Sequence, residues 1–144
     1  MKKIIFFSLL SLSLFFVACD NDDEATPMTT DLGYHAHIMS PSADNKHVGD
    51  TIHIHVNFES HAGEVVHNVQ VRIYNKDNDT EIFNGPDEGH VHETSGKYSF
   101  HKDFVLSEAN GVTGHSNWVL EAKVWGHHAS EGEAMETVEF HVHP

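Results

Sequence analysis

The side chains with the clearest potential for chemistry in this 144-residue chain are its 15 histidines. Many of them occur in pairs with His-x-His spacing. The pairs are His35/His37, His53/His55, His90/His92 and His141/His143, and His127/His128 are adjacent. On a β-strand, residues i and i+2 point the same way, about 6.5 to 7 Å apart, so two imidazoles can lean onto one ion. Neutral imidazole binds Zn²⁺, Cu²⁺ and Ni²⁺, and the pattern therefore predicts a divalent-metal site.

The stretch Thr51–Ser60 shows which element positions such pairs. Its sequence, TIHIHVNFES, alternates apolar residues with histidine, asparagine and glutamate. A period of two is typical of a half-buried β-strand, with one face packed and the other solvated. The histidines of this stretch are therefore expected on the solvated face.

Similar segments recur along the chain and are separated by turn residues such as Gly49-Asp50 and Asn110-Gly111. Further strands are expected at residues 31–40, 65–74, 80–83, 97–106, 117–126 and 135–143. No helical periodicity stands out. About seven short strands in just over a hundred residues predict an all-β, immunoglobulin-like or fibronectin-like β-sandwich. A small closed barrel is the alternative fold.

The immunoglobulin strand order predicts where the histidines gather. Alternate strands run in opposite directions in this fold. The start of the first strand, the turn after residue 60, the loop before Lys97 and the turn after residue 126 are therefore expected at the same end, or pole, of the sandwich. The metal site is expected at this pole, with imidazoles from separate segments. Its candidate ligands are His35, His37, His67, His90, His92, His127 and His128. The opposite pole and lower faces are expected to hold His47, His53, His115, His141 and His143, and solvated surface positions are expected for His47, His101 and His115.

The first residues have the pattern of a secretory signal. Lys2 and Lys3 precede the apolar run 4–17, which is shorter than the roughly 20 residues of a stable membrane span. The segment Phe16-Val17-Ala18-Cys19 resembles the lipobox of bacterial lipoproteins, which implies lipidation of Cys19 and a membrane anchor there. We therefore expect a signal peptide at 1–18, a lipidated Cys and acidic flexible tether at 19–30, and one domain at 31–144.

Charge narrows the class of partner. The formal net charge of −14 becomes −16 when residues 1–18 are removed, because that segment holds two lysines and no acidic residue. Such a surface attracts cations and repels phosphate backbones, so nucleic acid is not expected as a partner. Cys19 is the single cysteine, so no disulfide can form within the chain.

Four resemblances add expectations. The acidic run after Cys19 resembles the export tag of Bacteroidota-type surface lipoproteins, and the whole chain resembles small His-rich immunoglobulin-like lipoproteins of unknown function. These imply an outer-membrane lipoprotein of the cell envelope, periplasmic or surface-exposed. His35 and His37 resemble the N-terminal histidine of periplasmic copper-resistance sandwiches, although the methionine-rich loop of those proteins is missing. Gly89-His90-Val91-His92-Glu93 looks like the copper-ligand strand of copper/zinc superoxide dismutase, whose disulfide and zinc loop have no counterpart here.

The sequence thus predicts a lipid-anchored protein that captures or buffers a divalent metal, or delivers it to a transporter. Zn²⁺ is the first choice on ligand type, and Cu²⁺ or Ni²⁺ are alternatives. A dismutase-like activity is the single enzymatic reading. A different class is an acid-responsive or carbohydrate-binding adhesion module without metal, because histidine titrates between pH 5 and 8 and Trp125 could stack on a sugar.

Overall fold

The computed structural model describes residues 33–61, 64–87, 89–91, 95–127 and 132–144. The strands within these ranges are β1 (Tyr34–Ser40), β2 (Lys46–His47), β3 (Thr51–Ser60), β4 (Asn68–Asn75), β5 (Glu81–Gly85), β6 (Lys97–Val105), β7 (Ser116–Trp125) and β8 (Ala134–His143). A short 3-10 helix, η1 (Glu108–Asn110), precedes β7. Among the described residues, no helix has the length and apolar character that crossing a membrane requires.

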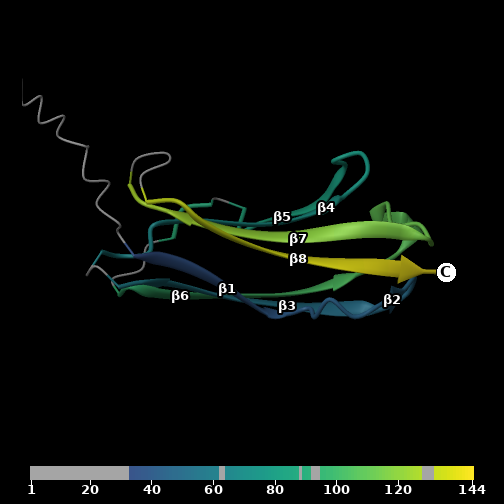
Figure 1. Cartoon of the computed structure of the whole chain (residues 1–144), viewed down its shortest axis with the longest axis horizontal. Coiled ribbons are helices and arrows are strands. Elements are labelled where there is room, and N and C mark those ends of the chain that lie inside the picture. The colour runs from purple at the N-terminus through teal and green to yellow at the C-terminus, as the bar shows by residue number, and fades with distance from the viewer. Residues whose placement is uncertain (1–32, 62–63, 88, 92–94, 128–131) are drawn as a thin grey trace, which may run out of the picture.

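The strands form two packed sheets, as Figure 1 shows. One sheet has the order β1-β3-β6, and the other has the order β2-β8-β7-β4-β5. Neighbours are antiparallel except β2, which runs parallel to β8. The predicted immunoglobulin-like sandwich is therefore confirmed, and the sheets do not close into a barrel. The described residues form eight strands rather than seven, because two residues of the polar loop before β3 pair with β8.

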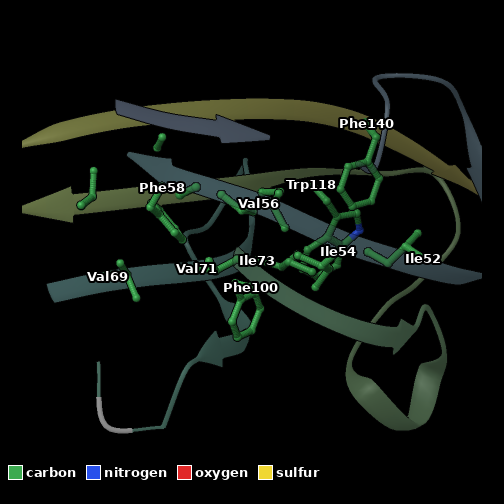
Figure 2. Packing of buried hydrophobic residues seen from close by; sticks show 14 of the residues in the cluster. Ile52, Ile54, Val56, Phe58, Val69, Val71, Ile73, Phe100, Trp118 and Phe140 are labelled. Atoms are coloured by element: carbon green, nitrogen blue, oxygen red, sulfur yellow. The ribbon is translucent and has the colours of Figure 1, made fainter. Parts of the chain in front are cut away.

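Strand β3 explains why the sheets pack. Its apolar residues Ile52, Ile54, Val56 and Phe58 are all buried, as the alternation predicts, whereas His53 between them is exposed. Figure 2 shows these side chains facing the apolar residues of the other sheet. The outer faces are consequently left to the polar residues of each strand, including the histidines.

The strand directions define two ends of the sandwich. At one end, which we call the tip, β1 begins and β3 ends, and in the second sheet β4 begins where β7 ends and β8 starts. At the opposite end, which we call the base, β8 reaches the C-terminus and β2 lies beside it (Figure 1). The predicted gathering of four chain segments at one pole is correct. Histidines gather at both ends.

Candidate metal centre

Three imidazoles meet at the base, on the outer face of the five-stranded sheet. Strand β8 supplies His141 and His143, and both project away from the core because Val142 between them is buried. The pairing of Ser116 with Val142 places His115, the residue before β7, beside His143. The potential ligand atoms of these three histidines all lie within 4.8 Å of one another. We call His115, His141 and His143 the base triad.

The spacing of the base triad suits one transition-metal ion. The ring centres of His141 and His143 are 4.7 Å apart, and that of His115 lies 6.0 Å from His143 and 6.2 Å from His141. Two imidazoles bound to one tetrahedral zinc have their ring centres roughly 5 Å apart and their nitrogens roughly 3.3 Å apart. Small side-chain rotations therefore bring the triad onto one ion. Three protein ligands leave the fourth position open to water or an exchanging ligand.

The turn that carries His115 is held in place from two sides. The hydroxyl of Ser116 donates to a carbonyl of the same turn and accepts a hydrogen bond from Nε1 of Trp118, at 2.7 Å. Trp118 is itself buried in the core. On the other side, Gly114 packs so closely on Pro144 that an added Cβ would lie 2.8 Å from its ring. His115 is therefore presented to the end of β8 by a packed backbone.

Hydrogen bonding and burial both favour the metal-binding form of these rings. Asn117 lies opposite His141, and its Oδ1 accepts a hydrogen bond from Nδ1 of His141 at 2.8 Å. The proton is thereby fixed on Nδ1, and the lone pair of Nε2 is left for an ion. Desolvation lowers the pKa of His143, and repulsion from His141, His47 and His115 lowers it further. A lowered pKa favours neutral imidazole, which is the ligand state.

A fourth imidazole borders the base triad. The parallel pairing of β2 with β8 sets His47 opposite His143, with ring centres 5.7 Å apart. Asp50 holds the β2 segment, because its Oδ2 accepts a hydrogen bond from the backbone N–H of His47 at 2.8 Å. His47 lies on the opposite side of His143 from β7, the strand that follows His115. It therefore borders the triad rather than closing it.

The predicted ligands among the described residues fall into two groups at the tip. Three of them come together from separate segments. The ring centre of His67 lies 4.0 Å from that of His90 and 4.2 Å from that of His127. We call His67, His90 and His127 the tip cluster. The other two, His35 and His37, lie on β1 in the other sheet.

His35 and His37 are stacked with ring centres 6.0 Å apart, which is the i, i+2 arrangement expected on a strand. His35 also contacts His61, with ring centres 4.9 Å apart. The Nε2 atom of His61 lies 3.5 Å from Oε2 of Glu59. This group lies on the outer face of the three-stranded sheet, apart from the three predicted ligands that form the tip cluster.

Several predictions fall outside the described residues or need correction. His92, His128 and Cys19 lie outside the described residues, so nothing is said of their structure. The solvated surface positions predicted for His47, His101 and His115 are correct, because all three residues are exposed. Each of them nevertheless has an imidazole neighbour: His47 contacts His143, His101 stacks on His55 with ring centres 4.2 Å apart, and His115 belongs to the base triad. Neighbouring strands create these contacts, which are invisible in a list of single residues.

The dismutase-like motif also differs from the strand that it resembles. In the described part of that motif, residues 89–91, His90 forms an isolated antiparallel bridge with Asn68 and belongs to no strand. The described part of the motif therefore lies in a loop beside the start of β4.

Sequence reasoning missed the base triad although one signal was present. The pair His141/His143 was recognised but assigned to the pole away from the expected site. The third member could have been found from the hairpin that joins β7 and β8, because its register pairs Trp118 with Phe140 and leads back to His115 opposite His143. That register depends on the geometry of the connection between the two strands, which residue types alone do not specify.

Comparisons with known proteins give no family. No protein-family model and no curated protein sequence matches the chain. Among solved structures, the chain is similar to the solution structure of a CARDB domain from Pyrococcus furiosus, with 17% identity over 78% of this chain and 94% of that one, and a TM-score of 0.49. The crystal structure of that domain in complex with di-metal ions has 15% identity, coverages of 76% and 84%, and a TM-score of 0.47. Murine CRIg has 13% identity, coverages of 76% and 99%, and a TM-score of 0.41.

Proposed function

We propose that this protein binds a divalent transition-metal ion, with Zn²⁺ as the first candidate and Cu²⁺ or Ni²⁺ as alternatives. The observation that carries the proposal is the base triad, whose three potential ligand atoms lie within 4.8 Å of one another. Imidazole nitrogen is a preferred ligand of all three ions, whereas Mg²⁺ and Ca²⁺ prefer oxygen. The formal net charge of −14 adds a general attraction for cations.

The exposure of the triad favours exchange over permanent storage. His115 is exposed and the other two residues are half-buried. Three ligands, one open position and access to solvent suit an ion that is taken up and released. Structural zinc, in contrast, has four protein ligands. Together with the expected lipid anchor at Cys19, this supports capture, buffering or delivery to a transporter at the cell envelope.

Zinc titration of the untagged chain, followed by calorimetry and by the imidazole ¹⁵N signals of the histidines, tests the proposal. We expect binding at micromolar affinity or better, with shifts of the His141 and His143 signals. Replacement of both residues by Ala should weaken binding at the base by at least about tenfold. The matched control is His53→Ala/His101→Ala, which removes two exposed histidines outside the triad. Unshifted His141 and His143 signals at saturating zinc would refute the assignment.

A carbohydrate-binding function is a second candidate because of one surface feature. A hollow beside the tip is lined by Trp125 together with the polar side chains of Gln70, Asn84 and Asp87. An indole surface with amide and carboxylate groups beside it is a combination that can bind a sugar ring. A chain that bound no zinc would leave this hollow as the better-supported site.

A further inference from the structure

Another group of histidines lies on the outer face of the three-stranded sheet, away from the base triad. Alternation turns one side of each strand outwards, and histidines occupy many of these positions on β1, β3 and β6. We call this group the histidine face. Its members are His35, His37, His53, His55, His61 and His101. All of them are exposed except His55, which is half-buried, so a partner in solution can reach the group.

The register between the strands arranges the histidine face as a stripe. His55 pairs with His101 across β3 and β6, and their rings stack with centres 4.2 Å apart. His53 lies one step closer to the base on β3, and the pairing of β1 with β3 places His37 and then His35 at the next two steps toward the tip. Residues on the same face of a strand are about 6.5 to 7 Å apart, so the stripe is roughly 20 Å long.

Few permanent charges lie among these histidines. On the described outward positions of β1, β3 and β6, the other ionisable side chains are those of Glu59, Lys97 and Asp103. The ammonium group of Lys97 lies 3.9 Å from the carboxylate of Glu59, and Nδ1 of His53 lies 2.5 Å from Oδ1 of Asp103. With neutral histidines, the face therefore has a formal charge of −1.

Acid reverses the sign of this charge. Histidine side chains gain their positive charge between about pH 8 and 5, whereas most carboxylates stay negative in that range. Protonation of all six histidines changes the formal charge of the face from −1 to +5. The carboxylate of Glu136, on β8 of the other sheet, accepts a hydrogen bond from the N–H of Ile38 at 2.7 Å. It adds one negative charge at the edge of β1, which does not cancel the change.

The outer face of the five-stranded sheet does not change in this way along its length. Strands β4, β5 and β7 contain no histidine. Three ion pairs lie on or beside this sheet, namely Arg72–Glu121, Lys76–Glu139 and Lys123–Glu133. Acid therefore gives one broad side of the sandwich a positive charge, on a chain whose formal net charge with neutral histidines is −14.

We propose that the histidine face binds a linear acidic polysaccharide at mildly acidic pH and releases it at neutral pH, independently of metal at the base. An extended polyanion is complementary to a cationic stripe, because its repeated charges can meet successive rows of histidines. The hydroxyl of Ser99 donates to Oδ1 of Asn57 at 2.7 Å, and this polar pair lies between the rows, where sugar hydroxyls can contact it. Anionic lipid suits the chain less well, because residues 20–24, next to the expected anchor, include four acidic side chains.

Titration of the untagged chain with polygalacturonate, followed by calorimetry in the presence of EDTA, tests the proposal. EDTA prevents a metal ion from bridging the carboxylates of the polymer and the histidines. We expect binding at about pH 5.5 that is at least about tenfold weaker at about pH 7.5. Added salt should weaken the binding, because exposed charges are screened. Dextran, a neutral polysaccharide, should not bind.

Two matched variants locate the binding surface. His53→Gln/His101→Gln removes two chargeable side chains from the histidine face and should weaken binding at the acidic pH by about three- to tenfold. His141→Gln/His143→Gln removes as many histidines from the base and should bind polygalacturonate as the wild type does. The first variant should bind zinc normally, so failure of this proposal is distinguishable from failure of the metal site. Circular dichroism checks that both variants fold.

Three results would overturn the proposal. The first is equal affinity at both pH values, and the second is an equal loss of affinity in the two variants. The third is binding to vesicles of anionic phospholipid by a chain that does not bind polygalacturonate, since the partner would then be a membrane. Trp125→Ala serves as a further control. A loss of polygalacturonate binding in this variant but not in His53→Gln/His101→Gln would assign the polymer to the hollow beside the tip and refute the proposal.

Discussion

Replacement of Asn117 by Ala isolates the contribution of ligand orientation to metal binding at the base. The side chain does not belong to the triad, but its Oδ1 accepts the hydrogen bond from Nδ1 of His141 at 2.8 Å. Without this partner, the ring of His141 can rotate and can carry its proton on Nε2, the nitrogen that faces an ion. The variant therefore keeps all three imidazoles and loses only the fixed tautomer and orientation of one.

The expected magnitude follows from the role of such partners in metal sites. Loss of a hydrogen bond to a ligating histidine typically weakens metal affinity by about 10- to 100-fold, or about 1.4 to 2.7 kcal/mol. The effect on folding should be small, because Asn117 is exposed and surface substitutions usually change the free energy of unfolding by less than about 0.5 kcal/mol. The substitution should thus weaken metal binding and leave the free energy of unfolding nearly unchanged.

The assay is zinc calorimetry in the background of His90→Ala/His127→Ala, so that the base alone is measured, with thermal unfolding of the metal-free protein beside it. Asn84→Ala is the matched control, since Asn84 is an exposed asparagine on β5. The control should bind zinc as its parent does. An unchanged dissociation constant in Asn117→Ala would contradict the reasoning that this side chain orients His141. A lowered unfolding temperature with weaker binding would indicate a structural role instead.

Two further predictions concern stability. Arg72 binds the nearly buried carboxylate of Glu121 through two hydrogen bonds of 2.8 and 3.1 Å, so Arg72→Met should lower the free energy of unfolding in urea by about 1 to 3 kcal/mol. Arg72→Met/Glu121→Leu should recover most of that loss, and a double variant as unstable as the single one would refute this account. Because the pKa of His143 is lowered on folding, its unfolded form holds more protons between the two pKa values. The free energy of unfolding of the metal-free protein should therefore fall as the pH drops through 6.5, the pKa of His143 in the unfolded chain. Unfolding curves recorded from pH 8 to pH 5 measure this fall, and His143→Gln should make it shallower.

The sequence by itself determined seven of the eight described strands and the layering of the domain. Alternation of apolar and polar residues at Thr51–Ser60 predicted both the strand and its buried face, because side chains of an extended chain point to opposite sides in turn. The same rule predicted the outer-face position of the histidines. The order of the strands then gave the two ends of the sandwich and placed His67, His90 and His127 at the same end.

Only the tertiary structure decided which imidazoles are neighbours. The base triad depends on the register between β7 and β8, and a shift of one residue would turn His141 and His143 into the core. Strand β2 could not be predicted, because two residues of a polar loop carry no periodicity and pair only since β8 offers a free edge. Contacts within a strand follow from spacing along the chain, whereas contacts between strands follow from hydrogen-bond register and packing. The histidines were therefore visible in the sequence, and their grouping into sites became visible in the fold.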